Sequence, residues 1–238
     1  MIDISLSLAA DQVKRDLIRG SATIVIDVLR ASSVIITALA NGASWVMPVA
    51  SVEEARSFRD KNPDSILGGE RDAVKLPGFD NGNSPFEYSR EKVEGKGIIL
   101  STTNGTKALA QCGDANEVII GAFINLNSVV EKIYSSENPI HILCAGTRGE
   151  FSLDDFLCAG GIISGISKKA EISSDDLGLL AKTYWENMPR GIHDALKESL
   201  HYNTLLARGF RRDLDYCLSL DTHTIVPMLD SEGLWLMA

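Results

Sequence analysis

The chain has 238 residues, long enough to bury a sizeable core, and no apolar run approaches the roughly 18 residues that would predict a membrane span. Its net charge of −9 argues against nucleic acid or an anionic membrane as a partner, so an anionic ligand would need a local cluster of positive side chains. The cysteines lack the spacing of zinc ligands, which predicts free thiols. The N-terminus lacks a signal-peptide pattern, so we expect a cytoplasmic protein.

The hydrophobic pattern predicts strands that alternate with helices along most of the chain. We expect strands over residues 1–8, 23–27, 45–49, 65–67, 97–100, 117–120 and 140–145. We expect helices over residues 10–20, 32–41, 52–61, 89–93, 107–110, 127–136 and 152–167. Residues from 173 onward are expected to be mostly helical, with a short strand at 225–226. The alternation predicts an α/β protein, a three-layer α/β/α sandwich whose sheet is mostly parallel and mixed at its edges.

The order strand, loop, helix, strand, helix occurs twice, in residues 23–55 and again in 97–131. This similarity favours an origin from duplicated βα units. No shift in composition marks a linker, so we expect residues 1–238 to form a single domain.

Polar side chains follow several of the predicted strands, and in parallel sheets ligands bind beyond the carboxyl ends of the strands. Asp27 and Arg30 follow the strand at 23–27, and Glu70 and Arg71 follow the strand at 65–67. The strand at 140–145 is followed by three polar residues, Thr147, Arg148 and Glu150. Carboxylates are ligands that Mg²⁺ prefers, and arginines bind phosphate or sulfonate oxygens in bidentate fashion. The alternative is that the acid and the arginine of each loop form a salt bridge that only stabilises the loop.

The strand at 97–100 is followed by uncharged donors and then by a helix start. The residues of this loop are Thr102, Thr103, Asn104, Gly105 and Thr106. Free N–H groups at a helix N-terminus bind anions, so the loop is a candidate phosphate cradle; ordinary helix capping is the alternative. It lacks the glycine and residue order of a Walker A loop.

A long segment at 72–88 has no regular pattern, which is typical of a functional lid or binding loop. We expect Asp80, Asn81 and Asn83 at its glycine-rich turn to close over the site. Asp154 and Asp155 at the start of the helix at 152–167 are interpreted as complements of the helix dipole. The histidines lie off these loops, and the C-terminal region carries no chemistry of its own.

Five segments, in order, resemble the 2-phosphosulfolactate phosphatase (ComB) family. They are IDVLRAS at 26–32, GGER at 68–71, GFDNGNSP at 78–85, STTNGT at 101–106 and CAGTRGEFSLDD at 144–155. The resemblance covers essentially the whole chain. It implies an α/β/α fold, dependence on Mg²⁺, and hydrolysis of 2-phospho-3-sulfolactate to sulfolactate and phosphate, a step of coenzyme M biosynthesis.

The roles of single residues follow from their chemistry. Asp27 and Glu150 are the expected catalytic residues and metal ligands, with Glu70 as a third ligand. Arg30, Arg71, Thr147 and Arg148 would hold the small phosphorylated and sulfonated substrate together with the cradle at 102–106.

Several alternatives stay open at this point. Asp27 could instead be a covalent nucleophile, the substrate could be a related phospho-acid, or the chain could be a non-catalytic sensor of such an acid. The C-terminal region either covers the sheet or forms the interface of a homodimer.

Overall fold

The structure, a computed structural model, describes residues 1–102, 105–188 and 190–237, and its strands and helices alternate as predicted up to Ser167. The strands are β1 (Ile2–Ser7), β2 (Ala22–Ile26), β3 (Trp45–Val49), β4 (Ile66–Arg71), β5 (Val74–Lys75), β6 (Gly97–Ser101), β7 (Glu117–Gly121), β8 (Ile140–Cys144), β9 (Ile172–Ser174), β10 (Pro227–Leu229) and β11 (Trp235–Met237). The α-helices are α1 (Arg15–Ile18), α2 (Ala31–Ala40), α3 (Val52–Lys61), α4 (Arg90–Val93), α5 (Gly105–Gln111), α6 (Leu126–Ile133), α7 (Leu153–Ser167), α8 (Asp176–Asn187), α9 (Ile192–Leu196), α10 (Leu200–Ala207) and α11 (Arg211–Cys217).

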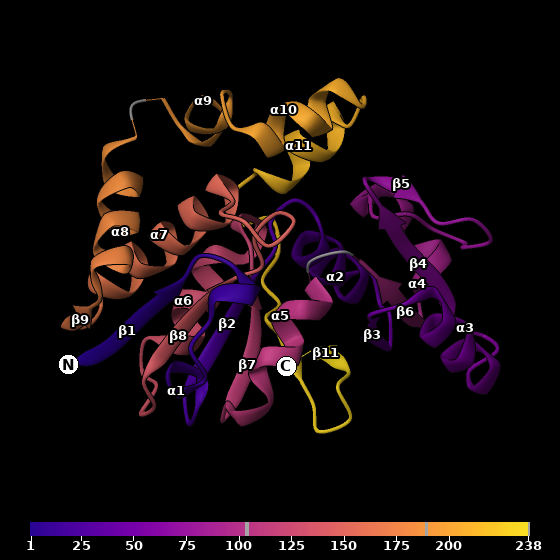
Figure 1. Cartoon of the computed structure of the whole chain (residues 1–238), viewed down its shortest axis with the longest axis horizontal. Helices are drawn as coiled ribbons and strands as arrows, with labels where there is room; N and C mark the ends of the chain where they lie inside the picture. Colours follow the sequence, from indigo (N-terminus) through magenta and orange to yellow (C-terminus); the bar gives the residue numbers. More distant parts are fainter. Residues whose placement is uncertain (103–104, 189, 238) are drawn as a thin grey trace.

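The sheet consists of two groups of parallel strands joined by an antiparallel hairpin. One group has the order β4–β6–β3, and the other has the order β7–β2–β8–β1–β9. The C-terminal hairpin β10–β11 lies between β7 and β3, with Met228 opposite Ile119 and Trp235 opposite Val46. Figure 1 shows this hairpin between the two groups. The sheet is therefore mostly parallel, as predicted, but its antiparallel strands lie at the centre as well as at the β5 edge.

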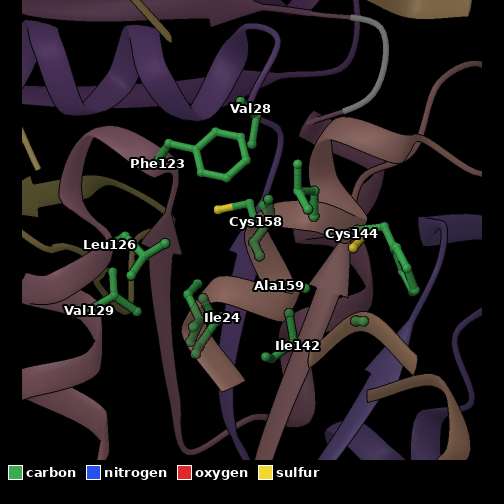
Figure 2. Close-up of a cluster of buried hydrophobic side chains, with 14 of the residues drawn as sticks. Ile24, Val28, Phe123, Leu126, Val129, Ile142, Cys144, Cys158 and Ala159 are labelled. Carbon is green, nitrogen blue, oxygen red and sulfur yellow. The ribbon is translucent and has the colours of Figure 1, made fainter. Parts of the chain in front are cut away.

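Apolar side chains cover both faces of the sheet, which confirms the α/β class. On one face β2 and β8 pack against α6 and α7, and Figure 2 shows Ile24 and Ile142 in this cluster with Cys158 and Ala159 of α7. On the other face, α2 and α5 pack against the strands, with Val34 and Ala108 among the buried residues. These clusters form the two interfaces of a three-layer sandwich.

Helix α7 is buried on almost every side, because α8 covers the face that points away from the sheet. The two helices approach closely at Gly160, where a Cβ atom would lie 2.2 Å from the carbonyl oxygen of Ala181. Only glycine permits this backbone contact without displacing a helix. The close packing fixes α7, whose first turn carries two acidic residues, relative to the sheet.

Both predicted repeats of strand, helix, strand and helix are present, as β2–α2–β3–α3 and β6–α5–β7–α6. Their strands pair across the repeats, because β2 lies parallel to β7 and β3 lies parallel to β6.

The segment at 72–88 is more regular than expected. It contains β5 and a 3₁₀ turn, Pro85–Glu87. Backbone bonds join residues 80 and 81 to Leu67 and Gly69 on β4, so this segment is tied to the sheet edge.

All four cysteines are buried free thiols, as predicted. Among the residues that the structure describes, no helix combines the length and apolar character that crossing a membrane requires.

The hairpin position predicts a large effect of truncating Trp235, which is 1% exposed and joins β11 to β3. We expect Trp235→Ala to lower the free energy of unfolding by about 3–5 kcal/mol, measured by urea denaturation. Met237 on the same strand is 57% exposed, so Met237→Ala should cost no more than about 0.5 kcal/mol. Similar losses from the two substitutions would contradict the central placement of this strand.

Candidate active site

A cavity of about 220 Å³ opens where loops from both parallel groups meet helix α10. Seven of the predicted site residues line it: Asp27, Arg30, Glu70, Asn83, Thr102, Thr147 and Arg148. The remaining lining residues are Leu29, Asp72 and Ala73 from the loops and Leu200, His201, Thr204, Leu205 and Arg208 from the C-terminal region. The loops after β2, β4, β6 and β8 thus converge as expected, although the strands before them belong to two groups.

Asp27 lies at the end of β2 and is 7% exposed. Its Oδ1 accepts a hydrogen bond of 3.3 Å from the Ala31 N–H in the first turn of α2. Burial raises the pKa of Asp27 to about 7; His201 and the Ala31 N–H act in the lowering direction, while Asp154 and Glu70 raise the pKa further. The cavity therefore holds a carboxylate whose charge lacks full compensation.

Asp155 joins two of the loops that form the cavity. Its Oδ1 accepts from the Val28 N–H after β2 at 2.9 Å, and its Oδ2 accepts from the Gly146 N–H after β8 at 3.1 Å. Burial raises the pKa of this carboxyl well above its usual range, and the neighbouring Asp154 and Asp27 raise it further. Asp155 lies in the first turn of α7, as expected, but it is 2% exposed and also ties the two loops together.

Asp154 forms a buried ion pair with His201 of α10, with 3.5 Å between Oδ2 and Nδ1. Its Oδ1 accepts from the Ser152 hydroxyl at 2.6 Å, and the Thr147 hydroxyl lies 3.2 Å from the same Nδ1 of His201. Burial acts to lower the pKa of His201, but Asp154 outweighs burial and raises it. Conversely, burial acts to raise the pKa of Asp154, and His201 lowers it. Both directions favour the charged pair.

Arg30 is buried, with 3% of its surface exposed, and its guanidinium group contacts two residues of the C-terminal region. Its Nη1 donates to Asp213 on α11 at 2.5 Å, and its guanidinium lies 4.0 Å from the centre of the Phe210 ring. Asp213 also accepts from the Ser84 hydroxyl at 3.0 Å, which connects α11 to the segment at 72–88. The C-terminal helices thus fix the orientation of a cation in the cavity wall.

The β4–β5 hairpin supplies two acidic residues, Glu70 and Asp72, to the cavity lining. Glu70 is 9% exposed, and its Oε2 accepts from the Ala73 N–H at 2.6 Å. Asp72 forms an exposed ion pair of 2.7 Å with Arg148, which joins loops from the two parallel groups. Asn83 is buried, and its Oδ1 has no hydrogen-bond partner among the described residues.

Two further predicted residues that the structure describes, Glu150 and Arg71, do not line the cavity. Glu150 is exposed and is not among the residues that line the cavity, so its expected role beside Asp27 stays a prediction that this arrangement does not support. Arg71 donates to the carbonyls of Glu70, Ala50 and Ser101 and to the Ser101 hydroxyl, so it joins strand ends instead of lining the cavity.

Asp80 and Asn81 also anchor the chain where we expected a closing lid. Asp80 accepts from Arg59 and from the Leu67 N–H at 2.9 Å each, and Asn81 donates to the carbonyl of Glu87. Of the proposed lid residues, Asn83 alone lines the cavity.

The proposed phosphate cradle is described only in part. Thr102 lines the cavity, whereas Thr103 and Asn104 lie outside the described residues. Gly105 and Thr106 begin helix α5, in agreement with the predicted helix start.

Sequence reasoning missed the contribution of α10 and α11. His201, Arg208 and Asp213 lie in a region without a recognisable motif, more than fifty residues beyond the last predicted site loop. The one available signal was the pair Asp154 and Asp155, since two adjacent acids at the start of an apolar helix need partners when that helix is buried.

Within the described ranges, no three His, Cys, Asp or Glu side chains form a ready-made metal site. Asp27 and Glu70 nevertheless line one cavity and interact electrostatically. Mg²⁺ is commonly held by one or two carboxylates, with water and phosphate oxygens completing its octahedron. The donor set therefore fits Mg²⁺ better than a metal that requires several protein ligands.

In comparison with known proteins, residues 8–232 match the model of the 2-phosphosulpholactate phosphatase family. The chain belongs to this family. A relative named probable 2-phosphosulfolactate phosphatase from Clostridium tetani (strain Massachusetts / E88) is 43% identical over 227 residues, which cover 95% of this chain and 97% of the relative. Another of the same name, from Clostridium perfringens (strain SM101 / Type A), is 45% identical over 90% of this chain and 88% of its own length. The family resemblance of the sequence motifs is thereby confirmed.

The Asp154–His201 pair predicts a stability effect that depends on pH. Because the folded pKa of His201 is raised above 6.5, the ion pair stabilises the fold fully below about pH 6.5, and this contribution is lost as pH rises through the folded value. We expect His201→Gln to reduce the free energy of unfolding by at least about 1 kcal/mol more at pH 6 than at pH 9.

Urea denaturation at both pH values measures this difference. The control is His193→Gln, since His193 is 45% exposed and lies 3.8 Å from Asp215 in a surface pair. That substitution should change stability by less than about 0.5 kcal/mol at either pH. An equal loss for His201→Gln at pH 6 and pH 9 would contradict the charged pair.

Proposed function

We propose that this protein is a Mg²⁺-dependent phosphoric monoester hydrolase that converts 2-phospho-3-sulfolactate to 3-sulfolactate and phosphate. Family membership along nearly the whole chain supports the substrate and the reaction. The observation that carries the proposal is a single cavity that combines buried acidic residues, an oriented arginine and a histidine paired with an aspartate. Three further properties of the protein remain predictions: a role in coenzyme M biosynthesis, a cytoplasmic location and a homodimeric state.

Asp27 and Glu70 are the residues that would hold Mg²⁺, and Asn83, which also lines the cavity, has a buried Oδ1 without a hydrogen-bond partner among the described residues. The raised pKa of Asp27 supports this assignment, because a buried carboxylate whose charge is not fully compensated gains from a nearby cation. When bound, the metal neutralises charge on phosphoryl oxygens and favours attack by water.

Arg30 and Thr102 are the proposed ligands of the phosphoryl oxygens. Asp213 and Phe210 hold the Arg30 guanidinium in place, so little conformational entropy is lost when it binds an anion. Thr102 adds a hydroxyl at the end of β6, next to the start of α5. Charge that spreads over the phosphoryl oxygens in the transition state would then meet donors that are already oriented.

His201 is the proposed donor of a proton to the ester oxygen that leaves. Its Nδ1 faces Asp154 and Thr147, so its Nε2, on the other side of the ring, is available to a ligand in the cavity. An alkoxide is a poor leaving group near neutral pH, and a positioned acid typically accelerates such a departure by about 10²–10⁴-fold. Asp154 keeps the imidazole protonated and fixes its orientation.

Phosphate release from 2-phospho-3-sulfolactate, measured with Mg²⁺ and with excess EDTA, tests this function. We expect turnover with Mg²⁺, loss of turnover with EDTA, and a fall in kcat of at least about 100-fold for Asp27→Asn. Glu150→Gln is the matched control, because Glu150 is exposed outside the cavity, and its kcat should change by less than about 3-fold.

The remaining outcomes separate the alternatives. Binding of the ester without phosphate release at any Mg²⁺ concentration would favour a sensor over an enzyme. Normal turnover by Asp27→Asn would exclude Asp27 both as a metal ligand and as a covalent nucleophile. Rapid-quench detection of an acyl phosphate would select the covalent version over direct attack by water.

A further inference from the structure

Helix α10 presents one face to the cavity. Its lining residues Leu200, His201, Thr204 and Leu205, with Arg208 at the C-cap, follow the spacing of neighbours on one side of a helix. His201 and Arg208 are separated by two helical turns, or roughly 11 Å along the axis. The same helix that places His201 beside Asp154 therefore places a second positive group well away from it.

Arg208 differs from the other arginines of the cavity in its partners. Arg30 is bonded to Asp213, and Arg148 is bonded to Asp72. The Arg208 side chain is exposed and has no ion-pair or hydrogen-bond partner among the residues that the structure describes. Its guanidinium thus keeps all its donors available to a ligand in the cavity.

Two of the three arginines that line the cavity, Arg30 and Arg148, already have carboxylate partners, so an anionic ligand would gain most from the third. Asp27, Glu70 and Asp72 all line the cavity, and the chain carries a net charge of −9. An acid group at the end of the ligand away from the ester would be repelled unless a positive side chain faced it. Guanidinium groups match the planar spacing of two oxygens on a carboxylate or sulfonate.

We propose that Arg208 binds the sulfonate of the substrate and makes the enzyme selective for phosphate esters that carry a second, distal acid group. This inference rests on the proposed function. In this arrangement His201 and Arg208 contact opposite ends of one ligand along α10, and the apolar Leu205 lies on the wall between them. Selectivity then comes from a helix outside the strand-end loops that form the rest of the cavity.

A purely structural role for Arg208 makes a different prediction. Arg208 is the C-cap of α10, where a positive charge also stabilises a helix dipole. Loss of that effect would lower stability and would affect all substrates alike. Binding of the distal acid would instead change the KM of substrates that carry this group and leave other substrates unaffected.

The test compares the hydrolysis of 2-phospho-3-sulfolactate with that of 2-phospholactate, which lacks the sulfonate. We expect Arg208→Met to raise the KM for the sulfonated ester about 10- to 100-fold, the usual effect of losing a charge-assisted hydrogen bond. The kcat for this ester and the KM for 2-phospholactate should each change by less than about 3-fold. Arg208→Lys should recover part of the lost affinity, because it keeps the charge without the planar pair of donors.

Arg211→Met is the matched control, since Arg211 lies on α11, pairs with Asp215 and does not line the cavity. It should leave both KM values unchanged. Equal losses on both esters by Arg208→Met, or no change on either, would overturn the inference.

If the wild type hydrolyses neither ester, the proposed function is wrong, but the role of Arg208 is not yet tested. Calorimetric titration of wild type and Arg208→Met with 3-sulfolactate then still tests the inference. Equal affinity of the two proteins for 3-sulfolactate, or no binding by either, would overturn it.

Discussion

The carboxylate of Asp155 holds together the two loops on which the cavity depends. One of its oxygens bonds the backbone after β2 and the other bonds the backbone after β8, so the ends of two adjacent parallel strands are fixed relative to α7. Because α7 is itself packed between the sheet and α8, this arrangement has little freedom to change. These contacts therefore also fix the positions of Asp27 and Thr147, which follow the two strands.

The residue before Asp155 extends the constraint to the C-terminal helices. Consecutive helical residues point in directions about 100° apart, so Asp154 faces His201 while Asp155 faces the loops. Burying two adjacent carboxylates is costly unless each finds donors. Backbone N–H groups donate to both oxygens of Asp155, whereas Asp154 accepts from the Ser152 hydroxyl and forms an ion pair with His201. Stability of the fold and positioning of the cavity histidine therefore have the same origin.

Much of the fold could be predicted from local patterns. Apolar strands, and helices that end at a glycine, are recognisable from the hydrophobic periodicity of about ten residues. The α/β class, the alternation up to Ser167 and the convergence of loops carrying Asp27, Glu70, Thr102 and Arg148 were predictable in this way. The central position of the β10–β11 hairpin was not. Its strands are short, and its placement depends on contacts with β3 and β7, far away in sequence.

The site was predicted less completely, for a physical reason visible at residues 147–150. Arg148 and Gly149 have φ values of 56° and 81°, as the central residues of type I′ turns do, and backbone bonds join Thr147 to Glu150. This tight turn places Arg148 at the cavity and leaves Glu150 exposed outside it. The amino-acid composition of the loop does not predict which of the two residues faces the cavity. His201 was missed because only tertiary packing brings α10 to the strand ends.

A crystal structure with 3-sulfolactate, inorganic phosphate and Mg²⁺ bound would test the central claim that this cavity is the reaction site. We expect the phosphate to contact Arg30 and Thr102, the metal to be ligated by Asp27, and sulfolactate to extend along α10 from His201 toward Arg208. Phosphate and sulfolactate bound elsewhere on the protein, with Arg30 and His201 contacting neither, would contradict the account.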